Sequence, residues 1–101
     1  MIKIKIAKNL EDKLIGLMGI KPINHGLLIP NCNRIHTYNM LDNIDILFLD
    51  LNYKIIFKFM NVTPNKIIMT NKNTHVLELP KHTSINYSLG DYLSFKDKNI
   101  V

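Results

Sequence analysis

The sequence predicts a mainly β domain, built as a small antiparallel barrel or folded sheet with one short N-terminal α-helix at about residues 10–18. Three observations lead to this prediction. The opening segment IKIKI alternates apolar and charged residues, as a half-buried strand does. The next segment, NLEDKLIGLMG, changes to helical spacing. From Gly26 onward, short apolar runs alternate with turn residues without a helical crossover, which favours antiparallel pairing.

The predicted helix is bounded by residues typical of helix ends. Asn9 has a side chain preferred at the N-cap, and Asp12 lies in the first turn, where an acidic group favours the helix dipole. Gly19 suits the C-terminal end. Apolar residues recur at helical spacing at Leu10, Leu14, Leu17 and Met18. One short helix is therefore expected directly after the first strand.

The later strands are predicted from apolar runs bounded by turn residues. These runs are GLLIP, RIHTYNM, IDILFLDL, KIIFKFMNV, HVLELP, SINYS and DYLSF. The longest segment between them, TPNKIIMTNKN, is expected to be a loop. It contains Ile67, Ile68 and Met69, which either fold back onto the core or form an exposed patch.

Length and composition are those of one ordinary globular domain, spanning residues 1–101. Hydrophobic residues make up 47% of the chain and charged residues 21%, which excludes a disordered protein. A chain of this size can bury enough surface to fold without metals or disulfides. The single cysteine, Cys32, has no partner for an internal disulfide. Stability is therefore expected to come from the hydrophobic core.

Basic charge is spread along the whole chain. The formal net charge is +5, but the 13 basic residues run from Lys3 to Lys98 and include a single arginine, Arg34. Nucleic-acid recognition favours clustered arginine and an aromatic platform, so this distribution argues against a nucleic-acid partner. The N-terminal segment has no continuous apolar stretch suited to a signal peptide or a membrane span, and a cytoplasmic location is expected.

The segment 34–40 would group several polar side chains if it were extended. Side chains of a strand alternate between two faces, so one set comprises Arg34, His36, Tyr38 and Met40. In a cleft, Arg34 could bind a carboxylate or phosphate through its planar guanidinium, with His36 and Tyr38 as hydrogen-bonding neighbours. In the structural alternative, Arg34 pairs with Glu78 or Asp91 and His36 holds a turn. The candidate ligand-binding residues are therefore Arg34, His36, Tyr38, Glu78 and Asp91.

Cys32 and His36 do not predict a metal site or a nucleophile with its base. In an extended strand they would lie roughly 13 Å apart, too far to share an ion or a proton. The remaining histidines, His25, His75 and His82, show no paired spacing either. No metal or other cofactor is expected, and Cys32 is interpreted as a small buried hydrophobe.

Several short motifs, taken in order along the chain, resemble the DUF192 family of small bacterial and archaeal proteins, which is named for its unknown function. The motifs are GLM (16–18), GLLI (26–29), HTYNM followed by IDILFLD (36–50), VLELP (76–80) and GD (90–91). The resemblance implies a compact, mainly β, barrel-like domain with a short helix, and no established enzyme activity. This chain lacks the arginine that usually precedes GLM and the basic residue that usually follows it, which puts a family-wide anion site at those positions in doubt.

Three functions remain open from the sequence. The favoured one is a non-enzymatic binding module whose rim recognises a small anionic ligand or a peptide segment. The second is an enzyme, of hydrolytic or other type, in which His36 acts with Glu78 or Asp91 from another strand. The third is a structural or protein-interaction domain that uses residues 67–69 or an unpaired edge strand.

Overall fold

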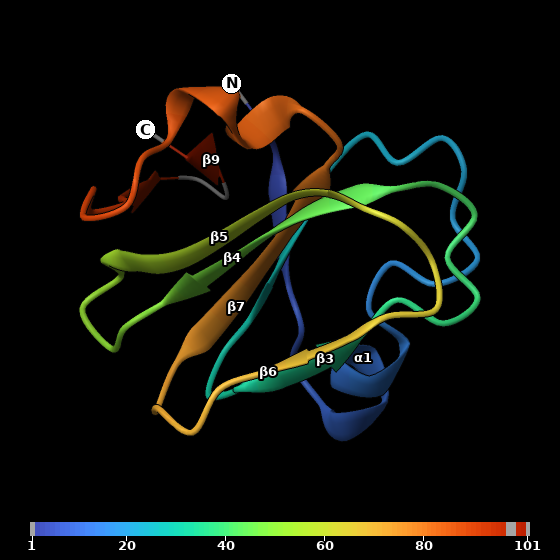
Figure 1. Cartoon of the computed structure of the whole chain (residues 1–101), viewed down its shortest axis with the longest axis horizontal. Coiled ribbons are helices and arrows are strands. Elements are labelled where there is room, and N and C mark those ends of the chain that lie inside the picture. Colours follow the sequence, from blue (N-terminus) through green and yellow to red (C-terminus); the bar gives the residue numbers. More distant parts are fainter. Residues whose placement is uncertain (1, 97–98, 101) are drawn as a thin grey trace.

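The computed structural model describes residues 2–96 and 99–100 of the 101-residue chain. At its centre lies a five-stranded sheet with the order β1-β2-β7-β4-β5 (Figure 1). These strands are β1 (Ile4–Ile6), β2 (Gly26–Ile29), β7 (His75–Pro80), β4 (Ile44–Leu49) and β5 (Ile55–Val62). Neighbouring strands are antiparallel except β1 and β2, which are parallel. Parallel pairing is allowed there because the long connection between the two strands includes the helix.

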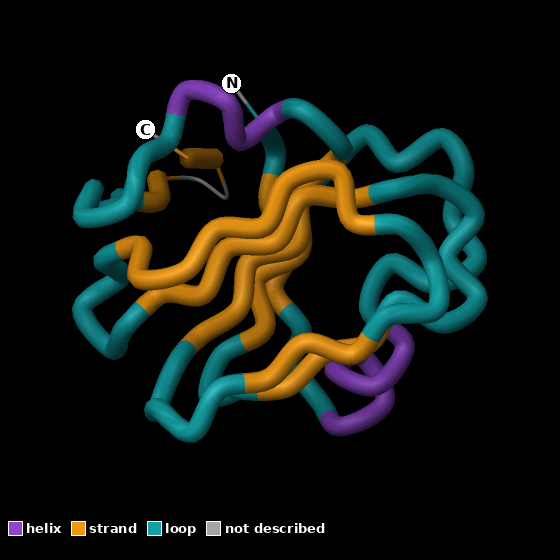
Figure 2. Tube along the Cα trace, in the orientation of Figure 1, coloured by secondary structure: helices purple, strands orange, loops and turns teal. Residues whose placement is uncertain are grey.

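Two small two-stranded sheets and two short helices complete the described fold (Figure 2). One sheet joins β3 (Arg34–His36) to β6 (Ile67–Met69), and the other joins β8 (Phe95–Lys96) to β9 (Asn99–Ile100). The helices are α1 (Leu10–Ile15) and the 3-10 helix η1 (Thr83–Asn86). In Figure 1, β3 and β6 lie beside α1 on one side of the central sheet, whereas η1 and β9 lie on the opposite side.

Both faces of the central sheet are buried, which explains why its strands are near-continuous apolar runs. Every residue of β2 and β4 is buried. On one face, Ile46, Phe48 and Val76 pack in a cluster that includes Ile35 of β3. The cluster on the other face includes Leu47, Leu49, Leu77, Leu93 and Ile100. The core is therefore two apolar layers that share the same three central strands.

The prediction of a mainly β fold with one short α-helix is confirmed. Of its two variants, a closed barrel and a folded sheet, the structure has the folded sheet. The five-stranded sheet does not close on itself, because β1 and β5 remain its two edges.

The helix is shorter than the predicted range 10–18. Asn9 caps it as expected, since its Oδ1 accepts a hydrogen bond from the backbone N–H of Asp12 at 2.8 Å. The helix ends at Ile15 because Gly16, and not Gly19, leaves the helical conformation, with φ at 55°. None of its six residues is buried. Of the apolar residues at helical spacing, those within the helix are therefore not buried, and Leu17, which follows the helix, lies in the core.

Two strand predictions near the C-terminus are wrong in extent or type. SINYS begins within η1, where Ser84 donates its backbone N–H to the carboxylate of Asp45 at 2.9 Å and so favours a helical turn over a strand. In DYLSF, only Phe95 belongs to β8.

The segment predicted as a loop, 63–73, contains β6. Its apolar triplet pairs with β3, and the two interpretations of that triplet both hold in part. Ile68 packs against the core, whereas Ile67 and Met69 are exposed.

Candidate functional site

A pocket of about 350 Å³ lies between α1, β3, β6 and β7, a volume typical of small-molecule sites. Four of the five predicted ligand-binding residues line it: Arg34, His36, Tyr38 and Glu78. Its lining also includes Lys13, Gly16 and four aliphatic residues, Leu14, Ile15, Ile35 and Ile67. The fold thus brings polar groups from segments far apart in the sequence to one apolar hollow.

Strand β3 supplies Arg34 and His36 to the pocket. It pairs antiparallel with β6, so that Arg34 lies opposite Met69 and His36 opposite Ile67. Ile35, between them, is buried in the core cluster, whereas Arg34 is exposed and His36 half-buried. Alternation along these three residues is therefore as predicted.

The strand ends at His36, but the predicted alternation continues for two more residues, because Thr37 is buried like Ile35 and Tyr38 is exposed. It fails at Asn39, which takes a left-handed φ of 59° that asparagine tolerates better than most residues. Thr37 fixes the turn, because its Oγ1 donates a hydrogen bond to the carbonyl of Thr63 at 2.8 Å. Met40 is consequently buried in the core, and the prediction that it shares a face with Arg34 is wrong.

Tyr38 reaches the pocket from this turn and stacks on His36. Their ring centroids lie 5.2 Å apart with the planes inclined by 25°. The Nδ1 atom of His36 accepts a hydrogen bond from the backbone N–H of Tyr38 at 3.2 Å, which fixes the proton of a neutral ring on Nε2. The pair gives the pocket an aromatic wall with a polar edge.

Glu78 is the buried polar group of the site. It lies in the middle of β7, between Leu27 of β2 and Ile46 of β4, and is only 2% exposed. Alternation places it on the same face of β7 as Val76, towards β3 and α1. Its Oε1 atom is buried and has no hydrogen-bond partner among the described residues. A carboxyl oxygen in this state is costly, because nothing replaces the water it has lost.

Burial changes the ionisation of Glu78. Loss of water raises its pKa from 4.5 to about 7, because the charged form is disfavoured in an apolar environment. The backbone N–H of Leu17 opposes this rise by favouring the carboxylate. Near neutral pH the group therefore exists as a mixture of the acid and the carboxylate.

Gly16 forms the wall next to this carboxyl group. Its φ of 55° is strained for other residues, and a Cβ atom there would lie 2.8 Å from Oε1 of Glu78. Glycine is thus required on two grounds, backbone conformation and space. Gly16 is not among the site residues predicted from the sequence, and its place at the start of the GLM motif is the signal that points to it.

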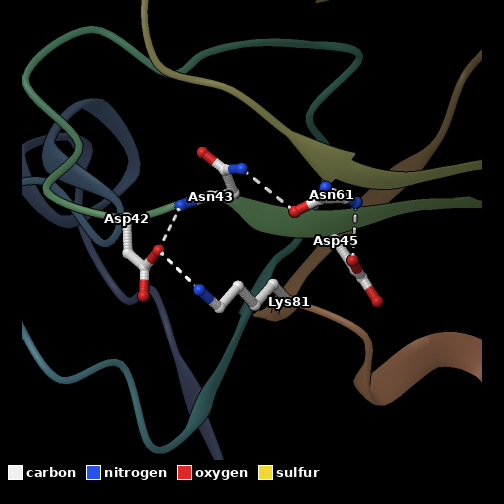
Figure 3. Close-up of polar contacts among 5 residues, drawn as sticks. All are labelled: Asp42, Asn43, Asp45, Asn61 and Lys81. Carbon is white, nitrogen blue, oxygen red and sulfur yellow. Dashed lines mark hydrogen bonds and ion pairs between the residues drawn. The ribbon is translucent and has the colours of Figure 1, made fainter.

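A second buried carboxylate, Asp45, has hydrogen-bond donors for both of its oxygens. Its two oxygens accept the backbone N–H of Asn61 at 2.8 Å and both the backbone N–H and the hydroxyl of Ser84, at 2.9 and 2.6 Å. Figure 3 shows Asp45, which lies on β4, below Asn61, which lies on β5. Although burial raises the pKa of Asp45, these hydrogen bonds outweigh it and the pKa is lowered. The contrast makes Glu78, and not Asp45, the candidate for binding or chemistry.

The cationic groups of the pocket have no acidic partners among the described residues. The ion pair that occurs among the described residues joins Nζ of Lys81 to Oδ1 of Asp42 at 3.2 Å, and it lies outside the pocket (Figure 3). Arg34 and Lys13 are therefore not neutralised by a carboxylate in the described part of the chain. Of the structural alternative, the pairing of Arg34 with Glu78 or Asp91 is not observed, whereas His36 does hold a turn by accepting the backbone N–H of Tyr38.

Asp91, the fifth predicted residue, does not line the pocket. Its Oδ2 accepts the backbone N–H of Ser88 at 2.9 Å, and its carbonyl accepts the N–H of Ile55 at 2.8 Å, so it fixes a turn beside the start of β5.

Neither Cys32 nor the histidines form a metal cluster. Across residues 2–96 and 99–100, no group of three or more His, Cys, Asp or Glu side chains is placed to hold an ion. Cys32 is half-buried and its thiol donates to the carbonyl of Arg34 at 3.1 Å. Within the same residues, no helix has the length and apolar character needed to cross a membrane.

The family model of DUF192, described as uncharacterized ACR, matches residues 1–95 of this chain. The chain belongs to the DUF192 family. The resemblance predicted from its motifs is thereby confirmed. No curated protein matches this DUF192 chain.

Two crystal structures share the fold of this DUF192 protein. One, from Novosphingobium aromaticivorans DSM 12444, is of a protein of unknown function; it aligns with a TM-score of 0.83 at 18% identity, over 93% of this chain and 75% of the other. The second, from Sinorhizobium meliloti 1021, is of a proposed transcription regulator; it has a TM-score of 0.82 at 24% identity, over 92% of this chain and 81% of the other. At these identities the likeness establishes the fold alone.

Proposed function

We propose that this DUF192 domain is a binding module that takes a small organic anion into the pocket between α1, β3, β6 and β7. The observation that carries the proposal is that Arg34 and Lys13 border one apolar pocket without an acidic partner among the described residues. An arginine guanidinium binds a carboxylate or phosphate through parallel hydrogen bonds, and the exposed Arg34 is accessible to such a group.

The lining also limits the ligand. Leu14, Ile15, Ile35 and Ile67 offer aliphatic surface, and the stacked His36 and Tyr38 rings offer a flat one. A ligand with an apolar body and one acidic group matches these walls better than a bare inorganic anion does. A pocket of about 350 Å³ accommodates a small molecule or the end of a peptide, but not a long peptide segment.

Titration calorimetry of the protein with 3-phenylpropionate tests this proposal. We expect saturable binding, weakened at least about tenfold in Arg34→Gln because one charge-assisted contact is lost. Lys72→Gln is the matched control, since it removes one positive charge outside the pocket lining. Equal weakening by the two substitutions would reduce the effect to net charge and overturn the proposed site.

Acid–base chemistry is a second candidate, supported by the presence of His36 and Glu78 in the same pocket. A carboxyl group with a pKa of about 7 can exchange a proton near neutral pH, as a general acid or base must. The described lining holds no serine, threonine or cysteine, so attack by a hydroxyl or thiol of those residue types is not the route that it favours, and activation of water by His36 or Glu78 fits it better. A panel of ester and phosphoester substrates tests this role: turnover abolished by both His36→Asn and Glu78→Gln supports it, and absence of turnover rejects it.

A further inference from the structure

We infer that the ligand of this pocket is a zwitterion, with an apolar body, an acidic group that meets Arg34, and a protonated amine that hydrogen-bonds Glu78. This inference rests on the proposed function and adds the chemical class of the ligand. It follows from the groups that the pocket leaves unpaired.

The carboxyl group of Glu78 needs a hydrogen-bond donor. Oε1 is buried and has no partner among the described residues, although the neighbouring strand β4 carries Asp45 with three donors around its carboxylate. Buried polar atoms in folded proteins are nearly always paired. Because the described chain does not supply the donor, a bound molecule is the natural source.

The ionisable groups that line the pocket are of both signs. Arg34 and Lys13 favour a negatively charged group on the ligand, and an ionised Glu78 favours a positively charged one. A simple acid would satisfy the first requirement only, and would place a second carboxyl group beside Glu78, which disfavours ionisation of both. A simple amine would satisfy Glu78 but would meet two cations. A molecule with both groups satisfies the whole lining.

The carboxyl group of Glu78 lies behind Gly16, which closes off Oε1. The next residue, Leu17, is buried in the core, so this wall stays in place. The ligand amine therefore approaches the carboxyl group from the pocket, which Glu78 itself lines. The aliphatic residues Leu14 and Ile15 of α1 also line the pocket and would contact the ligand body.

Binding of this kind has a signature in proton exchange. The free carboxyl group, with a pKa of about 7, is partly protonated at neutral pH, and a bound ammonium favours its ionised form. Binding should therefore release a proton and tighten as the pH rises from 6 to 8. The other titratable groups that face this site are Lys13, Arg34, His36 and Tyr38.

The experiment compares matched probes by titration calorimetry in two buffers that differ in ionisation enthalpy. One set is L-phenylalanine, 3-phenylpropionate and 2-phenylethylamine, and the other is 6-aminohexanoate, hexanoate and hexylamine, in which the two charges lie at opposite ends. Within at least one set we expect the zwitterion to bind at least tenfold more tightly than both analogues, with proton release. In Glu78→Gln we expect the zwitterion to lose its tighter binding relative to the acid and to release no proton. The affinity for the acid should change less than twofold.

The outcomes separate this inference from the proposed function. If the acid binds as tightly as the zwitterion and depends on Arg34, the anion site stands and the role of Glu78 is overturned. If no probe binds, both are overturned. Because the probes are compared on the unmodified protein, the result does not depend on whether Glu78→Gln folds.

Discussion

Glu78 and Asp45 are buried carboxyl groups on neighbouring strands, and the donors around them decide their different properties. Asp45 accepts three hydrogen bonds and has a lowered pKa, whereas Oε1 of Glu78 has no partner in the described part of the chain and the pKa of Glu78 is raised to about 7. From the sequence, Glu78 could be selected because it interrupts the leucines of VLELP. Its burial could not be predicted, because that depends on Gly16 and β3, which reach it from distant parts of the chain.

At the residue scale, Glu78 should make folding stability fall as the pH rises. The unfolded group ionises near its ordinary pKa of 4.5 and the folded group near 7, so the folded state binds more protons in between. This gap corresponds to about 3 kcal/mol of unfolding free energy, present at or below pH 4.5 and lost progressively up to about pH 7. Urea unfolding of the wild type and Glu78→Gln between pH 4.5 and 8 should show this as a growing advantage of the variant. A pH-independent difference would rule out the raised pKa.

Gly16 gives a second prediction at this scale. Gly16→Ala should destabilise the protein by about 2 kcal/mol or more, since it combines a positive φ with a contact of 2.8 Å to Glu78. Gly19→Ala is the matched control, because Gly19 also has positive φ, at 75°, but open space around it, and should cost only about 1 kcal/mol. Thermal or urea unfolding measures both, and equal losses would show that Gly16 does not press against the carboxyl group.

At the scale of elements, caps and alternation explain what could be predicted. Strands β2, β4, β5 and β7 were expected from their apolar runs, and the N-cap at Asn9 from its residue type. The end of α1 was misplaced because Gly16 and Gly19 are both suited to a helix end, and only packing against Glu78 distinguishes them. The type of η1 was missed because its Ser84 is held by Asp45, a contact 39 residues away in sequence.

Asp45 should therefore act as the link between β4, β5 and η1. In Asp45→Asn, an amide NH2 would replace one accepting oxygen opposite the backbone N–H of Asn61 or Ser84, and we expect a loss of about 2 kcal/mol or more in unfolding free energy. Asp42→Asn is the control, because the Asp42 pair with Lys81 is solvent-exposed and should matter little. Equal stability of the two variants in urea would contradict this role.

At the scale of the whole molecule, the central strands supply both faces of the core. Leu47 and Leu77 lie in one cluster, and Ile46 and Val76, from the same two strands, lie in the other. Periodicity could predict strands but not this arrangement, because a strand buried on both faces has no alternation to show which side chains belong together. The polar residues of the pocket can be predicted from the sequence. The residues that α1 adds to its lining cannot, because their position depends on the fold.

Because the two clusters share strands, the chain should unfold as one cooperative unit, as expected of a single domain over residues 1–101. Urea denaturation followed by far-ultraviolet circular dichroism and by tyrosine fluorescence should give coincident curves with one midpoint. Two separate transitions would show that the η1 side and the β3–β6 side of the sheet are stable independently.

The central claim is that a desolvated carboxyl group lies at the base of a ligand pocket, and the measurement that tests it most directly is a carbon-13 NMR titration of the Glu78 carboxyl carbon. The free protein should give a pKa of about 7, which should fall when a zwitterion such as L-phenylalanine or 6-aminohexanoate is bound. A value near 4.5 in the free protein would mean that Glu78 is hydrated or paired, and would contradict the account.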